Sequence, residues 1–350
     1  MKSFSSTTRP NLKSRSGPSR LTEVAALAAV SPATVSRAFN APHLLTAETR
    51  ARVVLAAQKL NYLPDGLARS LRRNRSMVVG AVMPSLRHAY FATTVEGIQS
   101  ELTRSGYTLL LGTAGFDQSA ELAAVRAMIR QGVDGFVLVG RQHDPELLPL
   151  LCAREKPFIL TWCYDTTLPS VGFDHRLAIQ AAVDHLVDLG HEEFVAVMAW
   201  QTLDREQERL AGIEEALARR GMRFGRERAI FAGGSAPQDG RNAFRAARAR
   251  FPQATAVVCA NDLLAAGVLM ECSALSLSVP GQISVVGYGD LDIAGAMNPA
   301  ITTVRAPAEE MGALAARSLL AKLAGEADLE HIELATELLV RASTGPARSL

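Results

Sequence analysis

Residues 21–40, LTEVAALAAVSPATVSRAFN, carry two short apolar patterns with helical spacing that are separated by a turn. Ser31 followed by Pro32 is typical of a helix start, because serine can cap the helix and proline lacks an N–H that would have no partner there. Further along the chain, Thr46 can cap a third helix that ends at Asn61. Three short helices, two of them joined by a tight turn, predict a helix-turn-helix domain.

Basic residues are concentrated around this helical segment. Residues 1–76 hold 13 Lys and Arg against 3 Asp and Glu, a balance of +10. The rest of the chain holds 24 basic and 32 acidic residues, a balance of −8. A small basic unit on a nearly neutral body indicates a polyanionic partner. Three helices packed only for stability are the alternative, which the basic balance disfavours.

The chain begins with residues 1–19, which are rich in Ser and Arg and lack the apolar run of a secretory signal. We expect a disordered basic arm there; an organellar transit peptide and a mis-assigned start codon are the alternatives. The basic segment 65–75, DGLARSLRRNR, is too short and too charged to bury itself, so we expect it to be disordered when free and helical when held by a partner. The predicted organisation is therefore an arm at 1–19, a helix-turn-helix domain at 20–63, a hinge at 64–76 and a core at 77–345.

From Met77 onward, apolar strand patterns alternate with amphipathic helix patterns. The expected strands are 77–83, 108–111, 135–139, 158–161, 194–198, 256–259 and 283–287. The expected helices are 92–104, 120–130, 179–189, 205–220 and 242–250. Such alternation predicts an α/β core with parallel sheets flanked by helices, and its length favours two lobes.

Several functional classes find no support in the sequence. The chain is 48% hydrophobic and 21% charged, and it has no apolar run long enough to span a membrane. Its four cysteines form no CxxC pair, which suggests a reducing cytoplasm. Phosphate-binding, nucleophile-elbow and zinc-protease motifs are absent, and the histidines are scattered. We therefore predict no catalytic residue, no metal site and no cofactor.

The second helix is the candidate DNA-reading element. If its first residues enter the major groove, Val35 and Ala38 face the domain core. The residues predicted to face double-stranded DNA are Ser31, Pro32, Ala33, Thr34, Ser36, Arg37 and Asn40. Arg37 suits guanine O6 and N7, whereas Pro32 and Ala33 offer only apolar contacts, for example to a thymine methyl group.

Motifs in the same order and spacing make the resemblance specific. Residues 21–40, Leu60-Asn61-Tyr62-Leu63-Pro64 and Leu67-Ala68-Arg69-Ser70-Leu71 resemble the head and hinge of the LacI family of bacterial transcription regulators. The similarity continues through Val133-Asp134-Gly135, Arg209-Leu210-Ala211-Gly212, Ala260-Asn261-Asp262 and Ser284-Val285-Val286-Gly287-Tyr288. It covers nearly everything from residue 20 to about residue 345.

This resemblance implies a homodimer whose heads bind a near-palindromic operator and whose two-lobed core, similar to periplasmic sugar-binding proteins, holds a small effector. It also places a minor-groove wedge at Leu71. Further DNA contacts implied by it are Arg20, Thr46, Thr49, Tyr62, Asp65 and Ala68. One departure concerns the turn before the second helix, where the family has Gly and this chain has Ala29; a left-handed alanine would cost roughly 1 kcal/mol.

For the effector, the family positions map onto Arg209, Asn261 and Asp262 of the second lobe. The loop opposite contributes His88, Tyr90 and Phe91. At two positions where relatives often carry aspartates, this chain has Trp162 and Gly289, and Asp290 follows the latter. The loss of two acceptors and the presence of Arg141 and His143 favour an anionic effector over a neutral sugar. Arg209 can bind such an anion through two hydrogen bonds. Runs such as 161–162, 171–174 and 287–290 resemble the gluconate-repressor branch, so a sugar acid is the expected effector. Core packing is the alternative for Trp162 and Phe173, and a solvated loop for Arg141 and His143.

The prediction is a cytoplasmic, nucleoid-associated repressor whose binding to DNA weakens when an effector closes the core, so induction is favoured over co-repression. The sequence does not settle whether the effector induces or co-represses. Alternatives are a regulator that responds to a neutral sugar or nucleobase, or a solute-binding protein or sugar-converting enzyme on the same core. No leucine heptad follows Arg341, so a dimer is expected and no tetramer.

Overall fold

The computed structural model describes residues 21–62 and 75–347. The chain divides into two compact units, Met1–Ser76 and Met77–Leu350. The arm at 1–19 and the predicted DNA contacts Arg20, Asp65, Ala68 and Leu71 lie outside the described residues.

The first unit contains the three predicted helices. They are α1 (Leu21–Ala28), α2 (Pro32–Asn40) and α3 (Ala47–Lys59), with a 3₁₀ turn at Pro42–Leu44. The Ser31 side chain accepts a hydrogen bond from the Thr34 backbone N–H, and Thr46 caps α3 by accepting from the Thr49 N–H. The three helices pack around a small buried core that includes Val24, Val35 and Val53. The helix-turn-helix prediction is therefore confirmed.

The turn between α1 and α2 contains a strained residue. Ala29 has φ of 52°, in the left-handed region that glycine adopts without cost. Ala29→Gly should therefore stabilise the first unit by about 1 kcal/mol, since it removes a clash between Cβ and the backbone. Urea unfolding followed by circular dichroism measures this. Ala26→Gly, at an exposed site inside α1, is the control and should destabilise by about 1 kcal/mol; if both variants lose stability alike, the strain is not significant.

The second unit begins with an α/β lobe around one parallel sheet, the first lobe. The sheet has the order β11-β5-β4-β3-β1-β2. Its strands are β1 (Val78–Met83), β2 (Thr108–Thr113), β3 (Gly135–Val139), β4 (Phe158–Thr161), β5 (Ser170–Gly172) and β11 (His331–Glu333). Its helices are α5 (Ala89–Arg104), α6 (Gln118–Arg130), α7 (Leu147–Ala153) and α13 (Ala308–Ala324). On β1, Val79 and Ala81 share a cluster with α5 and α13, whereas Val82 shares one with α6 and α7, so helices cover both faces.

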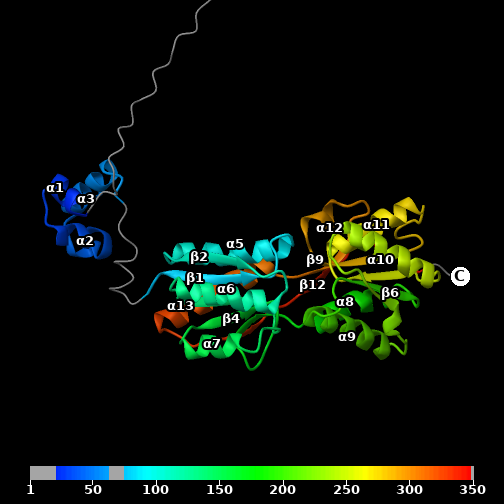
Figure 1. The fold of residues 1–350 in the computed structure, drawn as a ribbon. Helices are drawn as coiled ribbons and strands as arrows, with labels where there is room; N and C mark the ends of the chain where they lie inside the picture. Colours follow the sequence, from blue (N-terminus) through cyan, green and yellow to red (C-terminus); the bar gives the residue numbers. More distant parts are fainter. Residues whose placement is uncertain (1–20, 63–74, 348–350) are drawn as a thin grey trace, which may run out of the picture. The chain divides into compact units, whose positions relative to one another are not determined.

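The second lobe repeats this arrangement with the strand order β12-β10-β9-β8-β6-β7. Its strands are β6 (Phe194–Met198), β7 (Ala229–Phe231), β8 (Ala256–Cys259), β9 (Ser284–Gly289), β10 (Thr302–Arg305) and β12 (Glu337–Leu339). Its helices are α8 (His175–Asp188), α9 (Asp204–Arg219), α10 (Pro237–Arg250), α11 (Asp262–Ala274) and α12 (Asp292–Ala296), with a 3₁₀ turn at Arg226–Arg228. Only β12 runs antiparallel to its neighbour among these strands. Figure 1 shows α8 and α9 on one side of the sheet and α10 and α11 on the other.

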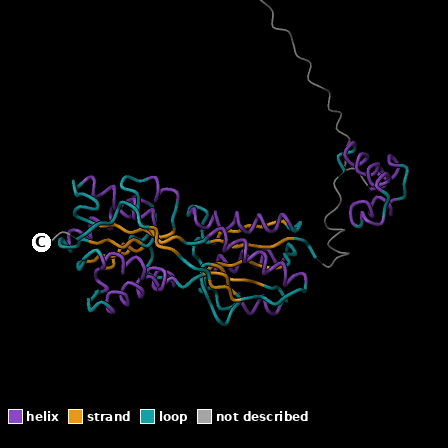
Figure 2. The backbone as a smooth tube through the Cα atoms, turned by 180° about the vertical axis from the view of Figure 1, so that it is seen from behind, coloured by secondary structure: helices purple, strands orange, loops and turns teal. Residues whose placement is uncertain are grey.

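The chain passes between the two lobes three times. It does so from β5 to α8, from β10 to α13 and from β11 to β12; Figure 2 shows these connections between the two groups of strands. Lobes linked by several parallel connections can rotate about them without unfolding. The expectation of a two-lobed α/β core is confirmed.

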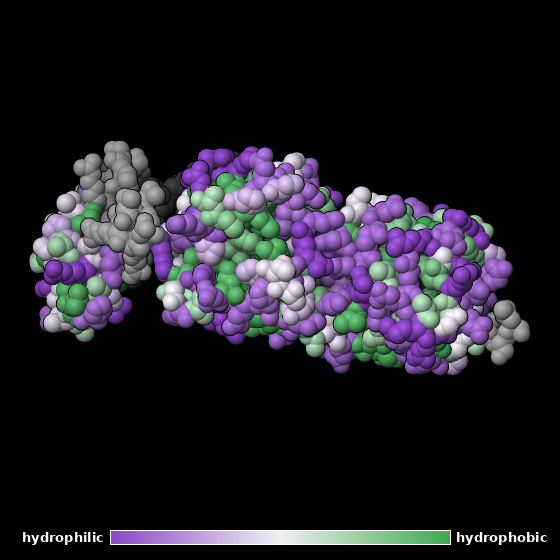
Figure 3. Space-filling model, turned by 90° about the horizontal axis from the view of Figure 1, so that it is seen from below, coloured by the Kyte–Doolittle hydropathy of each residue, from purple (hydrophilic) through white to green (hydrophobic). Residues whose placement is uncertain are grey.

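The face of the second unit seen in Figure 3 is mainly polar. In Figure 3 hydrophilic residues cover most of the visible face, and hydrophobic residues gather on part of the first lobe. None of the helices in the described ranges is long and apolar enough to cross a bilayer.

Candidate functional site

The exposed face of α2 is built by its cap and its helical period. Ser31, Pro32, Ala33 and Arg37 are exposed, and Val35 is fully buried. The other predicted contacts, Thr34, Ser36 and Asn40, are partly buried. The predicted division of α2 into an outward and an inward face is therefore present. Among the residues that the structure describes, none forms a hydrogen bond or ion pair with the Arg37 guanidinium.

The remaining described DNA candidates lie at the ends of α3. Thr46 is exposed, and its hydroxyl donates to Thr49 Oγ1 at 2.9 Å. The ring of Tyr62 lies 6.2 Å from the ring of Phe39, between centroids, and is partly buried. Tyr62 therefore fixes the end of the domain, whatever its role towards DNA.

In the second unit, a cavity lies between the two lobes, close to the carboxyl ends of strands from both sheets. This is where ligands bind in open α/β sheets. Trp162 follows β4, Asn261 follows β8 and Gly289 ends β9. We call it the aromatic cavity, and its lining consists of Tyr90, Phe116, Trp162, His175, Trp200, Leu203, Arg205, Glu206, Arg209, Ala260, Asn261, Tyr288 and Gly289.

A buried ion pair lies in this lining. Arg209 donates from Nη2 to Glu206 Oε1 at 2.5 Å, and the two side chains are only 9% and 5% exposed. The Arg209 guanidinium also lies over the Tyr288 ring, 4.9 Å from its centroid. Its Nε is buried and has no hydrogen-bond partner among the described residues. A buried donor without a partner is costly, so this Nε indicates a place for a ligand acceptor.

His175 connects the two lobes beside this pair. Its Nε2 lies 3.0 Å from the backbone oxygen of Trp162, and its Nδ1 lies 2.8 Å from the Tyr288 hydroxyl. Because the carbonyl oxygen can only accept, Nε2 carries the proton and Nδ1 accepts from Tyr288. The Trp162 indole N–H in turn donates to Thr94 Oγ1 at 3.1 Å. This chain of hydrogen bonds fixes the aromatic walls of the cavity.

The buried imidazole of His175 makes core stability depend on pH. Burial, and then the charges of Arg209 and Arg205, hold its pKa well below the usual 6.5. As the pH falls through 6.5, the unfolded chain takes up a proton that the folded core does not bind, so stability is lost. Between about pH 7.5 and pH 6 this loss should be less than about 1 kcal/mol.

The measurement is urea unfolding at both pH values for the wild type and His175→Gln, which should show a smaller pH dependence. His88, His185 and His191, whose pKa values are also lowered, and Asp262, whose pKa is raised to about 6, are common to both proteins. Their contributions therefore cancel in the difference between the two proteins. Identical pH dependence would show that His175 has no such role.

Some predicted effector residues line the cavity and others lie behind it. Tyr90, Trp162, Arg209 and Asn261 line it. Burial raises the pKa of Tyr90 to about 12, so its hydroxyl stays protonated. His88 and Phe91 do not belong to the lining; His88 stacks on Tyr90 with ring centroids 5.6 Å apart. It also bridges the lobes through Ser235 Oγ, 3.1 Å from His88 Nδ1.

Three further predicted residues support the lining from outside. Phe173 is fully buried, and its ring lies 4.6 Å from His175, so the packing alternative describes its position. Asp262 accepts from Thr303 Oγ1 at 2.6 Å and from the Leu291 N–H at 2.7 Å. Burial raises its pKa to about 6. Asp290 is outside the lining and pairs with two arginines, Arg305 and Arg341.

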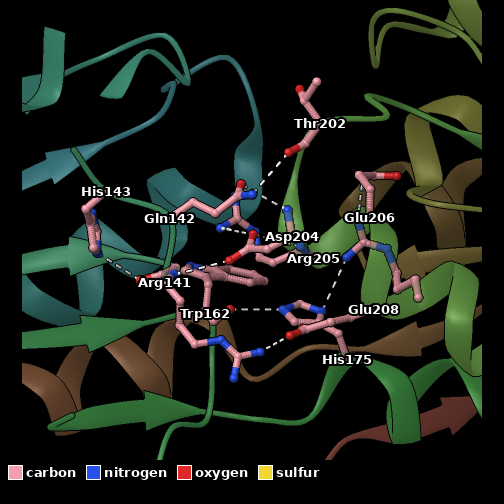
Figure 4. Close-up of polar contacts among 12 residues, drawn as sticks. Arg141, Gln142, His143, Trp162, His175, Thr202, Asp204, Arg205, Glu206 and Glu208 are labelled. Carbon is pink, nitrogen blue, oxygen red and sulfur yellow. Dashed lines mark hydrogen bonds and ion pairs between the residues drawn. The ribbon is translucent and has the colours of Figure 1, made fainter. Parts of the chain in front are cut away.

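Arg141 and His143 lie on the loop after β3, outside the aromatic cavity. The side chain of His143 is only 3% exposed, with its Nδ1 2.8 Å from Glu121 Oε2 and its Nε2 3.1 Å from the Gly140 oxygen. Arg141 pairs with Glu208 of the other lobe (Figure 4). The alternative of a solvated loop is therefore wrong for His143.

The same loop forms a set of polar contacts between the lobes (Figure 4). Gln142 donates from Nε2 to the Thr202 oxygen at 3.2 Å and accepts from the Asp204 N–H at 3.1 Å. The Arg141 N–H donates to Asp204 Oδ2 at 3.3 Å. Together with the Arg141–Glu208 ion pair, these bonds join the two lobes.

Beside the aromatic cavity lies a second one, which we call the acidic cavity. Its lining includes the carboxylates Asp117, Glu121 and Asp204. Phe116, Leu203 and Arg205 belong to both linings.

The free volume of the aromatic cavity is about 30 Å³, far below the roughly 300–1,000 Å³ of typical ligand sites. A ligand of sugar size therefore requires the lobes to open, or the lining side chains to move, before it binds.

Most of the charged and aromatic residues of the lining were not predicted from the sequence. Arg205 and Glu206 precede Arg209 by one helical turn on α9, so helical spacing from the predicted arginine could have found both. His175, Trp200 and Tyr288 carry no comparable signal, because their proximity depends on the packing of the two lobes.

Each of the two units matches a known protein family. Residues 20–65 match the family described as bacterial regulatory proteins, lacI family, and residues 183–344 match the periplasmic binding protein-like domain. The transcriptional regulator GntR of Escherichia coli is 29% identical over 87% of this chain and 92% of the relative. The transcriptional repressor PurR of Erwinia tasmaniensis is 30% identical over 93% and 97%.

Among solved structures, the lac repressor dimer bound to operator and an anti-inducer is similar over both units. It is 26% identical, covers 94% of this chain and 100% of its own, and superposes with a TM-score of 0.84.

Proposed function

This chain belongs to the LacI family of bacterial transcription regulators, as a DNA-binding repressor with an effector-binding core, and we propose that its effector is a sugar acid such as gluconate. The related proteins are regulators and not enzymes. The protein therefore acts through linked binding equilibria, in which the effector and the operator bind best to different arrangements of the core.

The charge of the aromatic cavity is the observation that carries this proposal. Its lining holds two guanidinium groups, Arg205 and Arg209, against one carboxylate, Glu206. His175 stays neutral because its pKa is so low. Asp204 lies outside this lining and 3.6 Å from Arg205. Within the lining itself guanidinium groups outnumber carboxylates among several aromatic side chains, and a carboxylate of the ligand compensates this difference. A neutral sugar would leave the charge unbalanced.

Isothermal titration calorimetry on the purified full-length protein tests the effector class. Gluconate and related sugar acids should bind, and glucose at the same concentration should not. The heat capacity change should be negative, because binding buries aromatic surface. Binding of neutral sugars but of no acid would replace the proposed effector by the neutral class.

We also propose that closure of the lobes transmits the signal. The polar contacts of Arg141 and Gln142 with α9 and the loop before it already join the lobes, and an effector in the aromatic cavity adds contacts to both. The protein acts as a homodimer on a near-palindromic operator in the bacterial cytoplasm, and effector binding releases it. Release follows if the effector binds more tightly to the arrangement of the core that is incompatible with operator binding.

A further inference from the structure

Arg205 differs from the other charged groups of the aromatic cavity because it has no hydrogen-bonded partner. Its side chain is 10% exposed, and the nearest carboxylate oxygen, Asp204 Oδ1, lies 3.6 Å from its Nη1. None of the described residues accepts a hydrogen bond from its guanidinium. Arg209, in contrast, is bound to Glu206 at 2.5 Å. The positive charge that is least tightly paired in the lining is therefore that of Arg205, whose ion pair with Asp204 is longer than the Arg209–Glu206 pair.

The position of Arg205 is fixed by a glycine of the opposite lobe. Arg205 lies in the first turn of α9 in the second lobe, and its guanidinium extends to the end of β3 in the first lobe. A Cβ placed on Gly140 would lie 2.3 Å from Arg205 Nη1. The glycine thus leaves the room that the guanidinium occupies when the lobes are closed.

We propose that Arg205 is the residue that binds the carboxylate of the effector and selects acids over neutral sugars. The inference rests on the proposed function, because it names the group that recognises the acid. A guanidinium whose N–H groups make no hydrogen bond can still bind an anion, and it can hold both carboxylate oxygens in a planar pair of bonds. Arg209 is already neutralised, so it orients the ligand rather than choosing its charge.

Arg205 also stands at the boundary of the aromatic and acidic cavities. An acid bound there directs the rest of its chain away from the guanidinium. Glu121 and Asp117 line the acidic cavity, and the carboxylate oxygens that His143 and the start of α6 do not use can accept hydrogen bonds from ligand hydroxyl groups. This arrangement fits a polyhydroxy acid better than a simple carboxylate.

Calorimetry with gluconate and glucose tests the assignment in the full chain. Arg205→Gln removes the charge and the 3.6 Å ion pair with Asp204, but Asp204 keeps its hydrogen bonds from the backbone N–H groups of Arg141 and Arg205, so the melting temperature should fall by only a few degrees. The variant should bind gluconate at least tenfold more weakly, and Arg205→Lys should recover only part of the affinity, because it lacks the planar pair of donors. If Arg205→Gln binds gluconate as the wild type does, the assignment is wrong while the proposed function stands.

A glycine pair separates the position of the guanidinium from its charge. Gly140→Ala should displace Arg205 and weaken gluconate binding by several-fold. Gly132→Ala has a similar left-handed φ, 80° against 77°, but nothing within 4 Å of the added methyl group, so it is the control for backbone strain. Equal affinities of the two variants would overturn the role of Gly140. If the wild type binds no sugar acid at all, the proposed function fails and this inference with it.

Discussion

Replacing Arg37 by alanine should weaken operator binding at least about 30-fold. One bidentate contact between arginine and guanine contributes about 1–3 kcal/mol of discrimination, and a dimer loses it in both heads. The effect should be specific, because Arg37 is exposed on α2 and has no partner among the described residues. The fold of the head should stay intact for the same reason.

The measurement is equilibrium binding to a selected operator and to a scrambled duplex of the same length at one salt concentration. Arg52→Ala is the matched control, since it removes an equal charge from an exposed position on α3. Arg52→Ala should weaken binding to both duplexes by the same factor, because the variant releases fewer counterions from the DNA. If Arg37→Ala also weakens both equally, Arg37 contacts phosphate and does not specify sequence.

Replacing Arg209 by glutamine should damage both stability and effector binding. The variant leaves Glu206 with its charge in a site where its side chain is only 5% exposed. Losing one partner of a buried ion pair costs about 3–5 kcal/mol. For a core of this size the melting temperature should fall by on the order of 10 °C. Gluconate binding should be lost, because the Tyr288 ring and Arg209 Nε no longer form one face of the cavity.

The double variant Arg209→Gln, Glu206→Gln separates the two effects. With no unpaired charge left, it should regain most of the thermal stability and still fail to bind gluconate. Differential scanning calorimetry measures stability, and titration calorimetry measures binding. If the single variant melts like the wild type, the ion pair does not act as a buried one; if the double variant binds gluconate normally, Arg209 is not part of the effector site.

The head was predictable from its sequence because its signals are local. Ser31 and Thr46 cap their helices through residues three positions away, and Asn61 takes the left-handed conformation that ends the third helix. The expected strands of the core were also confirmed in their places, since buried parallel strands give continuous apolar runs. The helices α7, α11, α12 and α13 and the short strands β5, β7, β10, β11 and β12 were not predicted. α11 is apolar on every side, which hides the helical period.

The cavity was predictable only in part, because its residues meet through the packing of two lobes. Tyr90, Trp162, Arg209 and Asn261 were identified by family motifs, whereas Arg205 was not. His143 is a case in which the sequence did not predict burial. A charged-looking loop residue is buried against Glu121, 22 positions earlier in the chain, and sequence spacing does not show such a contact.

Fluorescence anisotropy of the full-length protein on a selected palindromic operator, titrated with gluconate and with glucose, tests the central claim most directly. The account predicts that gluconate releases the DNA and that glucose at equal concentration does not. Release by glucose alone, or tight operator binding that no sugar acid disturbs, would contradict the claim that this repressor is controlled by a sugar acid.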